Sequence, residues 1–296
     1  GNRQPTLHVQ SMIGQEVVYQ DKGSIGLHLS STPGLNADFD GDEGNVHFLQ
    51  TSDAQVEARI IMSAKETIIS NGDSKPQSQL VYNSLVGGYM LSSDDTLFTM
   101  DEFRQGVRST RYMKSDYVKK NLETLFSRAG IVPEENTIVS GKILCSILFP
   151  ENFWYRNDDV YIVNGILVKG RFTKKHLKDS HNTLIQTFVK WHGNSVATDF
   201  ISAANFLFNW YVELSGLSIG IGDCVPEGIK SFDTFKDRET RELNNKFITL
   251  GIKKSEMSES QLVEKKLEMI RENKNRVQQE LVNIMPTFNN LTIMKD

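Results

Sequence analysis

Three aspartates stand at alternate positions in one short stretch of the 296-residue sequence: Asp38, Asp40 and Asp42. Because side chains alternate along an extended or gently curved backbone, this spacing places the three carboxylates on one side of the chain. Their mutual repulsion raises at least one pKa unless a divalent cation lies between them. Oxygen ligands without histidine or cysteine favour Mg²⁺, Mn²⁺ or Ca²⁺ over zinc or copper.

Two other interpretations of this stretch are a calcium-binding EF-hand loop and a solvated acidic turn. An EF-hand loop that starts at Asp38 would need glycine at its sixth position and glutamate at its twelfth. The sequence has Glu43 and Leu49 at these positions, so the EF-hand is excluded. The solvated turn stays open, because acidic turns are common and the residues alone do not exclude it.

The elements that must position the aspartates form a β-rich beginning and a helical remainder. Residues 11–20, 24–30 and 45–50 are predicted as strands, and helical periodicity begins near residue 53. The first unit is therefore expected to close between residues 52 and 70. Further helices are predicted at 77–91, 101–109, 115–129, 140–149, 181–192 and 194–215. A small meander is predicted over 153–169, with a hairpin turn at Asn164-Gly165.

The last part of the sequence is strongly charged and helical. Apolar residues recur by four and three at positions 263, 267, 270, 277, 281 and 284, and Lys274 interrupts them. One stripe of a long helix is therefore apolar and requires a partner. Residues 234–250 can supply this partner as the other arm of a helical hairpin.

Composition excludes several classes of protein. The apolar fraction is 39%, and no apolar run reaches the roughly 18 residues of a membrane span. Cys145 and Cys224 lie far apart, which excludes a disulfide framework or a zinc knuckle. The net charge is −4, and residues 1–50 carry two basic and six acidic side chains. This acidic balance is typical of a metal site and not of a surface that binds duplex nucleic acid.

The stretch from Asn36 to Asp42, which reads Asn-Ala-Asp-Phe-Asp-Gly-Asp, resembles the signature of the largest subunit of multisubunit DNA-dependent RNA polymerases. Residues 3–8, Arg-Gln-Pro-Thr-Leu-His, are similar to another motif of that family. Residues 216–223, Gly-Leu-Ser-Ile-Gly-Ile-Gly-Asp, are similar to a third. The three motifs occur in the family's order, so the resemblance covers essentially the whole chain.

The resemblance implies an α+β fold with three parts. Residues 1–55 would form part of a double-psi β-barrel that carries the metal loop. Residues 56–190 would form a mixed, mainly helical pore region, and residues 191–296 a funnel with a helical hairpin. The three aspartates would hold the catalytic Mg²⁺, Arg3 and Asn36 would bind the ribose of the incoming nucleotide, and Phe39 would plug the core under the loop.

The resemblance further implies a catalytic-core fragment that transfers ribonucleoside triphosphates to an RNA 3′ end, with Mg²⁺ and a DNA template. The fragment is expected to be inactive alone. Its expected partners are other polymerase subunits, the second-largest especially, together with template, transcript, and a transcript-cleavage factor at the funnel. No membrane is involved, and the expected location is intracellular: the nucleus, or the cytoplasm for a version from a large DNA virus. The alternative is a non-catalytic interaction module that lines the nucleotide-entry channel.

Overall fold

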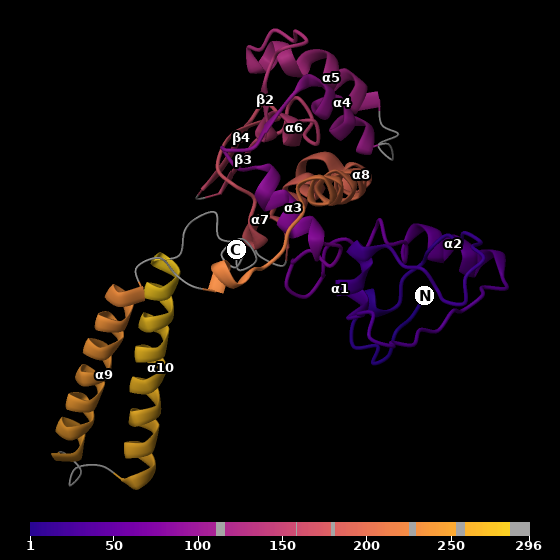
Figure 1. Cartoon of the computed structure of the whole chain (residues 1–296). Helices are drawn as coiled ribbons and strands as arrows, with labels where there is room; N and C mark the ends of the chain where they lie inside the picture. The colour runs from indigo at the N-terminus through magenta and orange to yellow at the C-terminus, as the bar shows by residue number, and fades with distance from the viewer. Residues whose placement is uncertain (111–115, 158, 179–180, 225–228, 253–257, 285–296) are drawn as a thin grey trace. The chain divides into compact units, whose positions relative to one another are not determined.

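The computed structural model describes residues 1–110, 116–157, 159–178, 181–224, 229–252 and 258–284. The chain divides into two compact units, Gly1–Gly216 and Leu217–Asp296. Helices and small antiparallel sheets make up the described fold (Figure 1), which confirms the α+β class. The division into 1–55, 56–190 and 191–296 stays a prediction, as does the double-psi barrel.

The first 64 residues are mostly loops held by short helices. These helices are η1 (Val9–Ser11), η2 (Leu29–Ser31), α1 (Thr32–Leu35) and α2 (Ser52–Ile60). Isolated bridges join Asn2 to Met12 and to Asn45, and Gly14 to Ser63. This first part of unit 1 is therefore organised by a few long-range backbone contacts and not by a continuous sheet.

The prediction of strands at 11–20, 24–30 and 45–50 was wrong. The structure forms no regular strand in these three ranges, all of which lie among the described residues. Val17, Tyr19 and Phe48 are 78%, 87% and 80% exposed. A strand needs a neighbouring strand whose backbone donates hydrogen bonds to it and accepts hydrogen bonds from it. Residue alternation can indicate that a segment suits a sheet, but it does not supply the neighbouring strand.

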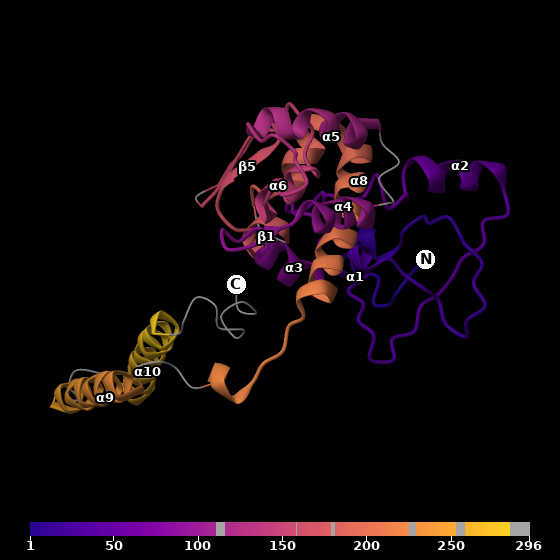
Figure 2. The ribbon, with the colours of Figure 1, turned by 45° about the horizontal axis from the view of Figure 1, so that its top comes forward.

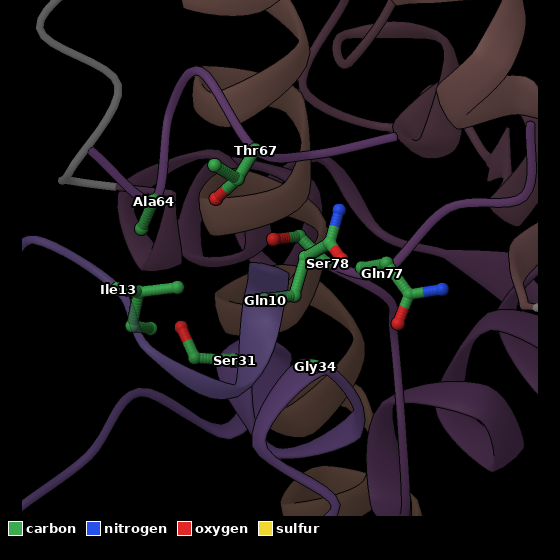
Figure 3. Close-up of a pocket in the computed structure, with 8 residues that line it drawn as sticks. All are labelled: Gln10, Ile13, Ser31, Gly34, Ala64, Thr67, Gln77 and Ser78. Carbon is green, nitrogen blue, oxygen red and sulfur yellow. The ribbon is translucent and has the colours of Figure 1, made fainter. Parts of the chain in front are cut away.

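A small void lies where residues 10–34 pack against residues 64–78 (Figure 3). Its lining residues come from both segments: Gln10, Ile13, Ser31, Gly34, Ala64, Thr67, Gln77 and Ser78. The cavity volume of about 10 Å³ leaves room for one water molecule at most. This contact is therefore a packing interface that holds α1, and with it the loop that follows, against the rest of unit 1.

The core of unit 1 surrounds the crossing of α3 (Asn83–Leu91) and α8 (Leu184–Ser215), which lie side by side in Figure 2. Phe149, Phe153, Phe188 and Phe200 are buried and stack on one another, with ring centroids 4.3–6.1 Å apart. The surrounding elements are β1 (Leu97–Phe98), α4 (Met100–Ser109), α5 (Asp116–Ala129), β2 (Val139–Ser140), α6 (Gly141–Ser146) and α7 (Lys174–Leu177).

The helices lie where the sequence predicts them. Their boundaries differ from the predicted ones for local reasons. The helix predicted at 101–109 begins at Met100, because Thr99 caps it and forms a capping box with Glu102. The helix predicted at 77–91 begins only at Asn83, because Tyr82 has a φ of 54°, which no helical residue adopts. The helix predicted at 140–149 ends at residue 146. The two helices predicted around Gly193 form one element, α8, with a break at that glycine (φ 81°, ψ 171°).

The predicted meander is confirmed as a three-stranded antiparallel sheet. It consists of β3 (Tyr155–Asn157), β4 (Val160–Val163) and β5 (Ile166–Lys169), in that order. Asn164 and Gly165 have φ values of 49° and 72°. Positive φ at both central positions is what a two-residue type I′ hairpin turn requires.

Unit 2 contains η3 (Ile221–Cys224) and two packed helices, α9 (Ile229–Ile252) and α10 (Glu259–Asn283). The predicted pairing of two helices is confirmed. The first half of the stripe predicted on α10 was misplaced, whereas Val277, Leu281 and Ile284 of its second half are half-buried. Val263, Leu267 and Ile270 are 53%, 48% and 44% exposed. Leu262 is buried instead, because the face of α10 toward α9 is rotated by about one residue. None of the described helices is both long and apolar enough to cross a membrane.

Candidate metal centre

The aspartate loop begins where α1 ends. The backbone N–H of Ala37 donates to the carbonyl of Thr32 at 2.9 Å, and that of Asn36 to the carbonyl of Pro33 at 3.1 Å. Asn36 takes the left-handed conformation (φ 48°, ψ 43°) that ends many helices, and asparagine tolerates it better than most residues do. The chain therefore turns out of α1 at Asn36 and enters the loop at the surface of unit 1.

The three aspartates of the loop converge. One carboxylate oxygen from each of Asp38, Asp40 and Asp42 lies within 4.8 Å of the others. Gly41 has a φ of 115°, a value that residues with a side chain rarely adopt, and no atom lies near the position of its absent Cβ. Glycine is therefore needed here for the bend that turns Asp42 back toward Asp38.

Arg3 and Asp42 form a two-pronged ion pair. The Nε of Arg3 donates to Oδ2 of Asp42 at 2.7 Å, and its terminal nitrogen donates to Oδ1 at 2.9 Å. The backbone N–H of Asp38 adds a third hydrogen bond to Oδ2 at 3.0 Å. The hydrogen bonds from Arg3 and then from the Asp38 amide hold the pKa of Asp42 below its usual value.

Asp38 has the opposite electrostatic environment. Its side chain shares a hydrogen bond with Asp40, and the negative charges of Asp40 and Asp42 lie close to it. A shared hydrogen bond and like charges both favour the protonated form, so the pKa of Asp38 is raised. The crowding that the alternate spacing predicts therefore has the expected effect on one of the three carboxyls.

Backbone contacts bring Arg3 to a loop that lies 39 residues away in the sequence. The N–H of Asn2 donates to the carbonyl of Asn45 at 2.9 Å, and the N–H of Asn45 donates back at 2.8 Å. The N–H of Arg3 donates to the carbonyl of Ser11 at 3.2 Å. The residue just before Arg3 is therefore held to a residue just after the aspartate loop, which places the Arg3 side chain beside Asp42.

A cavity of about 640 Å³ opens beside the loop. Arg3, Asn36 and Asp38 line it, together with Lys75 and Lys178 from later segments. This volume is within the range of ligand-binding pockets. Its lining carries both charges, because Asp73 lies 3.8 Å from Lys75 and Lys178 adds a further positive side chain. The structure therefore brings both predicted ribose-binding residues to one cavity with a predicted metal ligand. No motif in the sequence marks Lys75 as a site residue.

The expectation that Phe39 plugs the core was wrong. Phe39 is 65% exposed, and its ring centroid lies 6.4 Å from that of Tyr82, which also lines the cavity. The alternation that turns the aspartates toward one another turns Phe39 to the opposite side of the loop. In unit 1 that side faces Tyr82 and solvent, and not the interior.

The donor set fits a hard divalent cation such as Mg²⁺ or Mn²⁺. All three donors are carboxylate oxygens, which these cations prefer. The three oxygens lie within 4.8 Å of one another, so rotations of the side chains would bring them to a single cation. Among the described residues, no other group of three acidic, histidine or cysteine side chains has such spacing.

Comparison with known proteins places the chain in a family. The family described as RNA polymerase Rpb1, domain 2 matches residues 1–64, and RNA polymerase Rpb1, domain 3 matches residues 67–224. The second match alone covers more than half of the chain.

Individual relatives agree with these matches. The chain is 32% identical over 235 residues to a probable DNA-directed RNA polymerase II subunit RPB1 homolog of Invertebrate iridescent virus 6, a match that covers 76% of the chain and 23% of the relative. It is 30% identical over 227 residues to the DNA-directed RNA polymerase subunit Rpo1N of Halobacterium salinarum, covering 75% and 22%. It is 24% identical over 245 residues to the DNA-directed RNA polymerase I subunit RPA190 of Saccharomyces cerevisiae, covering 75% and 15%.

The chain thus spans less than a quarter of the length of these three relatives. They come from a virus, an archaeon and a eukaryote, and each is named as a polymerase subunit. The three motifs of the sequence lie inside the regions that the two family domains match. The chain belongs to the family of the largest subunit, Rpb1, of multisubunit DNA-directed RNA polymerases.

Proposed function

We propose that this chain is the catalytic-core part of a DNA-directed RNA polymerase, in which Asp38, Asp40 and Asp42 hold Mg²⁺. The reaction is the templated transfer of ribonucleoside triphosphates to an RNA 3′ end. The observation that carries this proposal is the convergence of the three carboxylates, to within 4.8 Å, in a chain of the Rpb1 family. A solvated acidic turn would not need the bend at Gly41 or the ion pair that holds Asp42.

The residues around the loop suit this chemistry. Bound Mg²⁺ supplies charge neutralisation at the phosphate and lowers the pKa of the attacking 3′-hydroxyl. The aspartates supply the oxygen ligands. Asn36 exposes an amide that both donates and accepts hydrogen bonds, as recognition of ribose hydroxyls requires. Lys75 and Lys178 place positive charge in the wall of the cavity, where it favours the phosphates of a nucleotide.

The proposed partners are the other polymerase subunits, the second-largest above all, with the DNA template and the RNA transcript. The exposed apolar side chains of residues 1–64, Val17 and Phe48 among them, support an assembly in which other chain segments cover them. A transcript-cleavage factor at the funnel is a further proposed partner. The alternative, a non-catalytic module that lines the nucleotide-entry channel, has no comparable observation in its favour, because it leaves the convergence of the aspartates unexplained.

Replacement of one ligand tests the proposal. In the assembled polymerase that contains this chain, Asp40→Asn removes one anionic ligand and keeps the shape of the side chain. RNA synthesis is expected to fall by at least about 10³-fold, since a metal site with two carboxylates neither positions nor neutralises the reacting groups well. The measurement is extension of an RNA primer on a DNA template, together with co-purification of the subunits.

The matched control is Glu16→Gln, which removes one negative charge from an exposed residue outside the loop. It should leave RNA synthesis unchanged. Normal elongation by the Asp40→Asn polymerase would exclude the catalytic role, whereas loss of co-purification would show that the loop serves assembly.

A further inference from the structure

The three carboxylates repel one another, so something must hold them together before a cation arrives. Asp38 and Asp40 share a hydrogen bond. Asp42 is held to Asp38 by the Asp38 backbone N–H and by a side-chain hydrogen bond, but these contacts do not offset its negative charge. Arg3 supplies the opposite charge, and its two hydrogen bonds of 2.7 and 2.9 Å engage both oxygens of the Asp42 carboxylate.

The ion pair between Arg3 and Asp42 is held in one geometry, unlike most ion pairs on protein surfaces. The side chains of Arg3 and Asp42 are 21% and 22% exposed, although Asp42 as a whole residue lies in the exposed loop. The planar guanidinium meets the carboxylate through two parallel hydrogen bonds, the geometry that restricts both partners most. The backbone of Arg3 is itself bonded to Ser11, and its neighbour Asn2 to Asn45, so the guanidinium is presented from a fixed position.

The hydrogen bonds also determine which Asp42 oxygen remains available. Oδ2 accepts from Nε of Arg3 and from the backbone N–H of Asp38, so both of its lone-pair sites are used. Oδ1 accepts one hydrogen bond from Arg3 and keeps one site. A cation would therefore meet Asp42 through Oδ1 alone, while Arg3 stays in place.

We infer that Arg3 is a positioning residue, which orients the Asp42 carboxylate for the divalent cation in addition to its proposed contact with the ribose. This inference rests on the proposed function. Hydrogen bonds to ligating carboxylates typically change metal affinity by about 10- to 100-fold. The positive charge of Arg3 acts in the opposite direction, but salt and solvent screen it at this partly exposed site. The orientation effect is therefore the larger one.

The experiment measures cation binding without any nucleotide, so that a ribose contact plays no part. The assembled polymerase is titrated with Mn²⁺, and free Mn²⁺ is followed by electron paramagnetic resonance. Backbone cleavage at residues 36–44 by Fe²⁺-generated hydroxyl radicals, in competition with Mn²⁺, identifies the site. Arg3→Ala is expected to weaken Mn²⁺ binding at the loop by about 10- to 100-fold.

Arg3→Lys separates charge from geometry. Lysine keeps the positive charge and cannot form the two-pronged contact, so most of the loss should persist. Lys22→Ala, which removes the other basic side chain of residues 1–50, should bind Mn²⁺ as the unchanged protein does. In an Asp42→Asn background, Arg3→Ala should add little further loss, because the two residues act as one unit.

Enzyme kinetics provide a second measurement. If Arg3 positions Asp42, high Mg²⁺ concentration restores part of the activity of Arg3→Ala; if it contacts only the ribose, high nucleotide concentration does so instead. Unchanged or tighter Mn²⁺ binding by Arg3→Ala overturns the inference and leaves the proposed function intact. Absence of Mn²⁺-protected cleavage at residues 36–44 in the unchanged polymerase would refute the proposed function itself.

Discussion

At the scale of single residues, Tyr82 has an unusual backbone geometry. Its φ of 54° and ψ of −131° belong to a region that is essentially restricted to glycine. Such a conformation costs about 1–3 kcal/mol and persists only where the surroundings impose it. Tyr82 lines the cavity beside Asp38, and its ring faces the exposed ring of Phe39. The strain therefore lies at the wall of the proposed nucleotide site.

Replacement of Tyr82 should reverse the usual order of stability between alanine and glycine. Tyr82→Gly relieves the backbone strain, whereas Tyr82→Ala loses the ring and keeps the strain. The glycine variant is expected to be more stable than the alanine variant by about 1 kcal/mol, after allowance for the greater freedom of glycine in the unfolded chain. Urea denaturation of the two variants measures this difference. A more stable alanine variant would show that the backbone at residue 82 is not strained.

At the scale of elements, the crossing of α3 and α8 depends on the absence of a side chain. A Cβ atom at Gly87 would lie 2.1 Å from the backbone carbonyl oxygen of Phe208. Glycine in a helix normally costs about 0.5–1 kcal/mol relative to alanine. Close approach of two helix backbones is the reason why α3 carries glycine at position 87, whereas a Cβ atom at Gly88 would meet the side chains of Phe208 and Leu177 at 3.0 and 3.1 Å.

Gly87→Ala is therefore expected to destabilise unit 1 by about 1–3 kcal/mol, although the same change stabilises most helices. The clash is with backbone, which a rotamer change cannot relieve. Gly72→Ala is the control, because its nearest contact is the Ser70 hydroxyl at 3.8 Å. Thermal unfolding should show a lower Tm for Gly87→Ala only. Equal Tm values would mean that α3 and α8 can separate at no cost.

The pairing of α9 and α10 in unit 2 depends on a buried polar contact. Glu239 is only 4% exposed, and its carboxylate pairs with Arg276 at 3.2 Å. The side-chain amide of Asn273 donates to the Glu239 carbonyl at 3.1 Å and to its carboxylate at 3.4 Å. These polar partners explain why the face of α10 toward α9 differs from its most apolar stripe.

Asn273→Ala should destabilise the helix pair by about 1–3 kcal/mol, because a buried carboxylate and carbonyl lose a donor. Hydrogen–deuterium exchange of peptides from α9 and α10 measures the loss locally as faster exchange in both helices. Asn244→Ala, on an exposed position of α9, is the matched control and should not speed exchange. Equal exchange in both variants would show that the apolar contacts at Leu250 and Leu262 suffice.

At the scale of the whole molecule, local patterns predicted the helices and the meander better than the β-rich beginning. Helix caps and the Asn164-Gly165 turn depend on residues close in sequence, so their signals are readable there. Strands in residues 1–50 depend on partner segments, and exposed side chains such as Val17 show that no partner covers them within unit 1. No sequence pattern predicts the backbone conformation of Tyr82 either, because contacts with other parts of unit 1 impose it.

The sequence by itself predicted that the three carboxylates converge, because the aspartates and Gly41 are close together in the chain. It also determined the family, through motifs that the family matches bear out. Only the tertiary structure decided that Arg3 meets Asp42, that Lys75 and Tyr82 line the same cavity, and that Phe39 faces outward. These contacts join residues that lie 39 or more positions apart in the sequence. Their formation depends on how distant segments pack, which no spacing of residue types along the chain encodes.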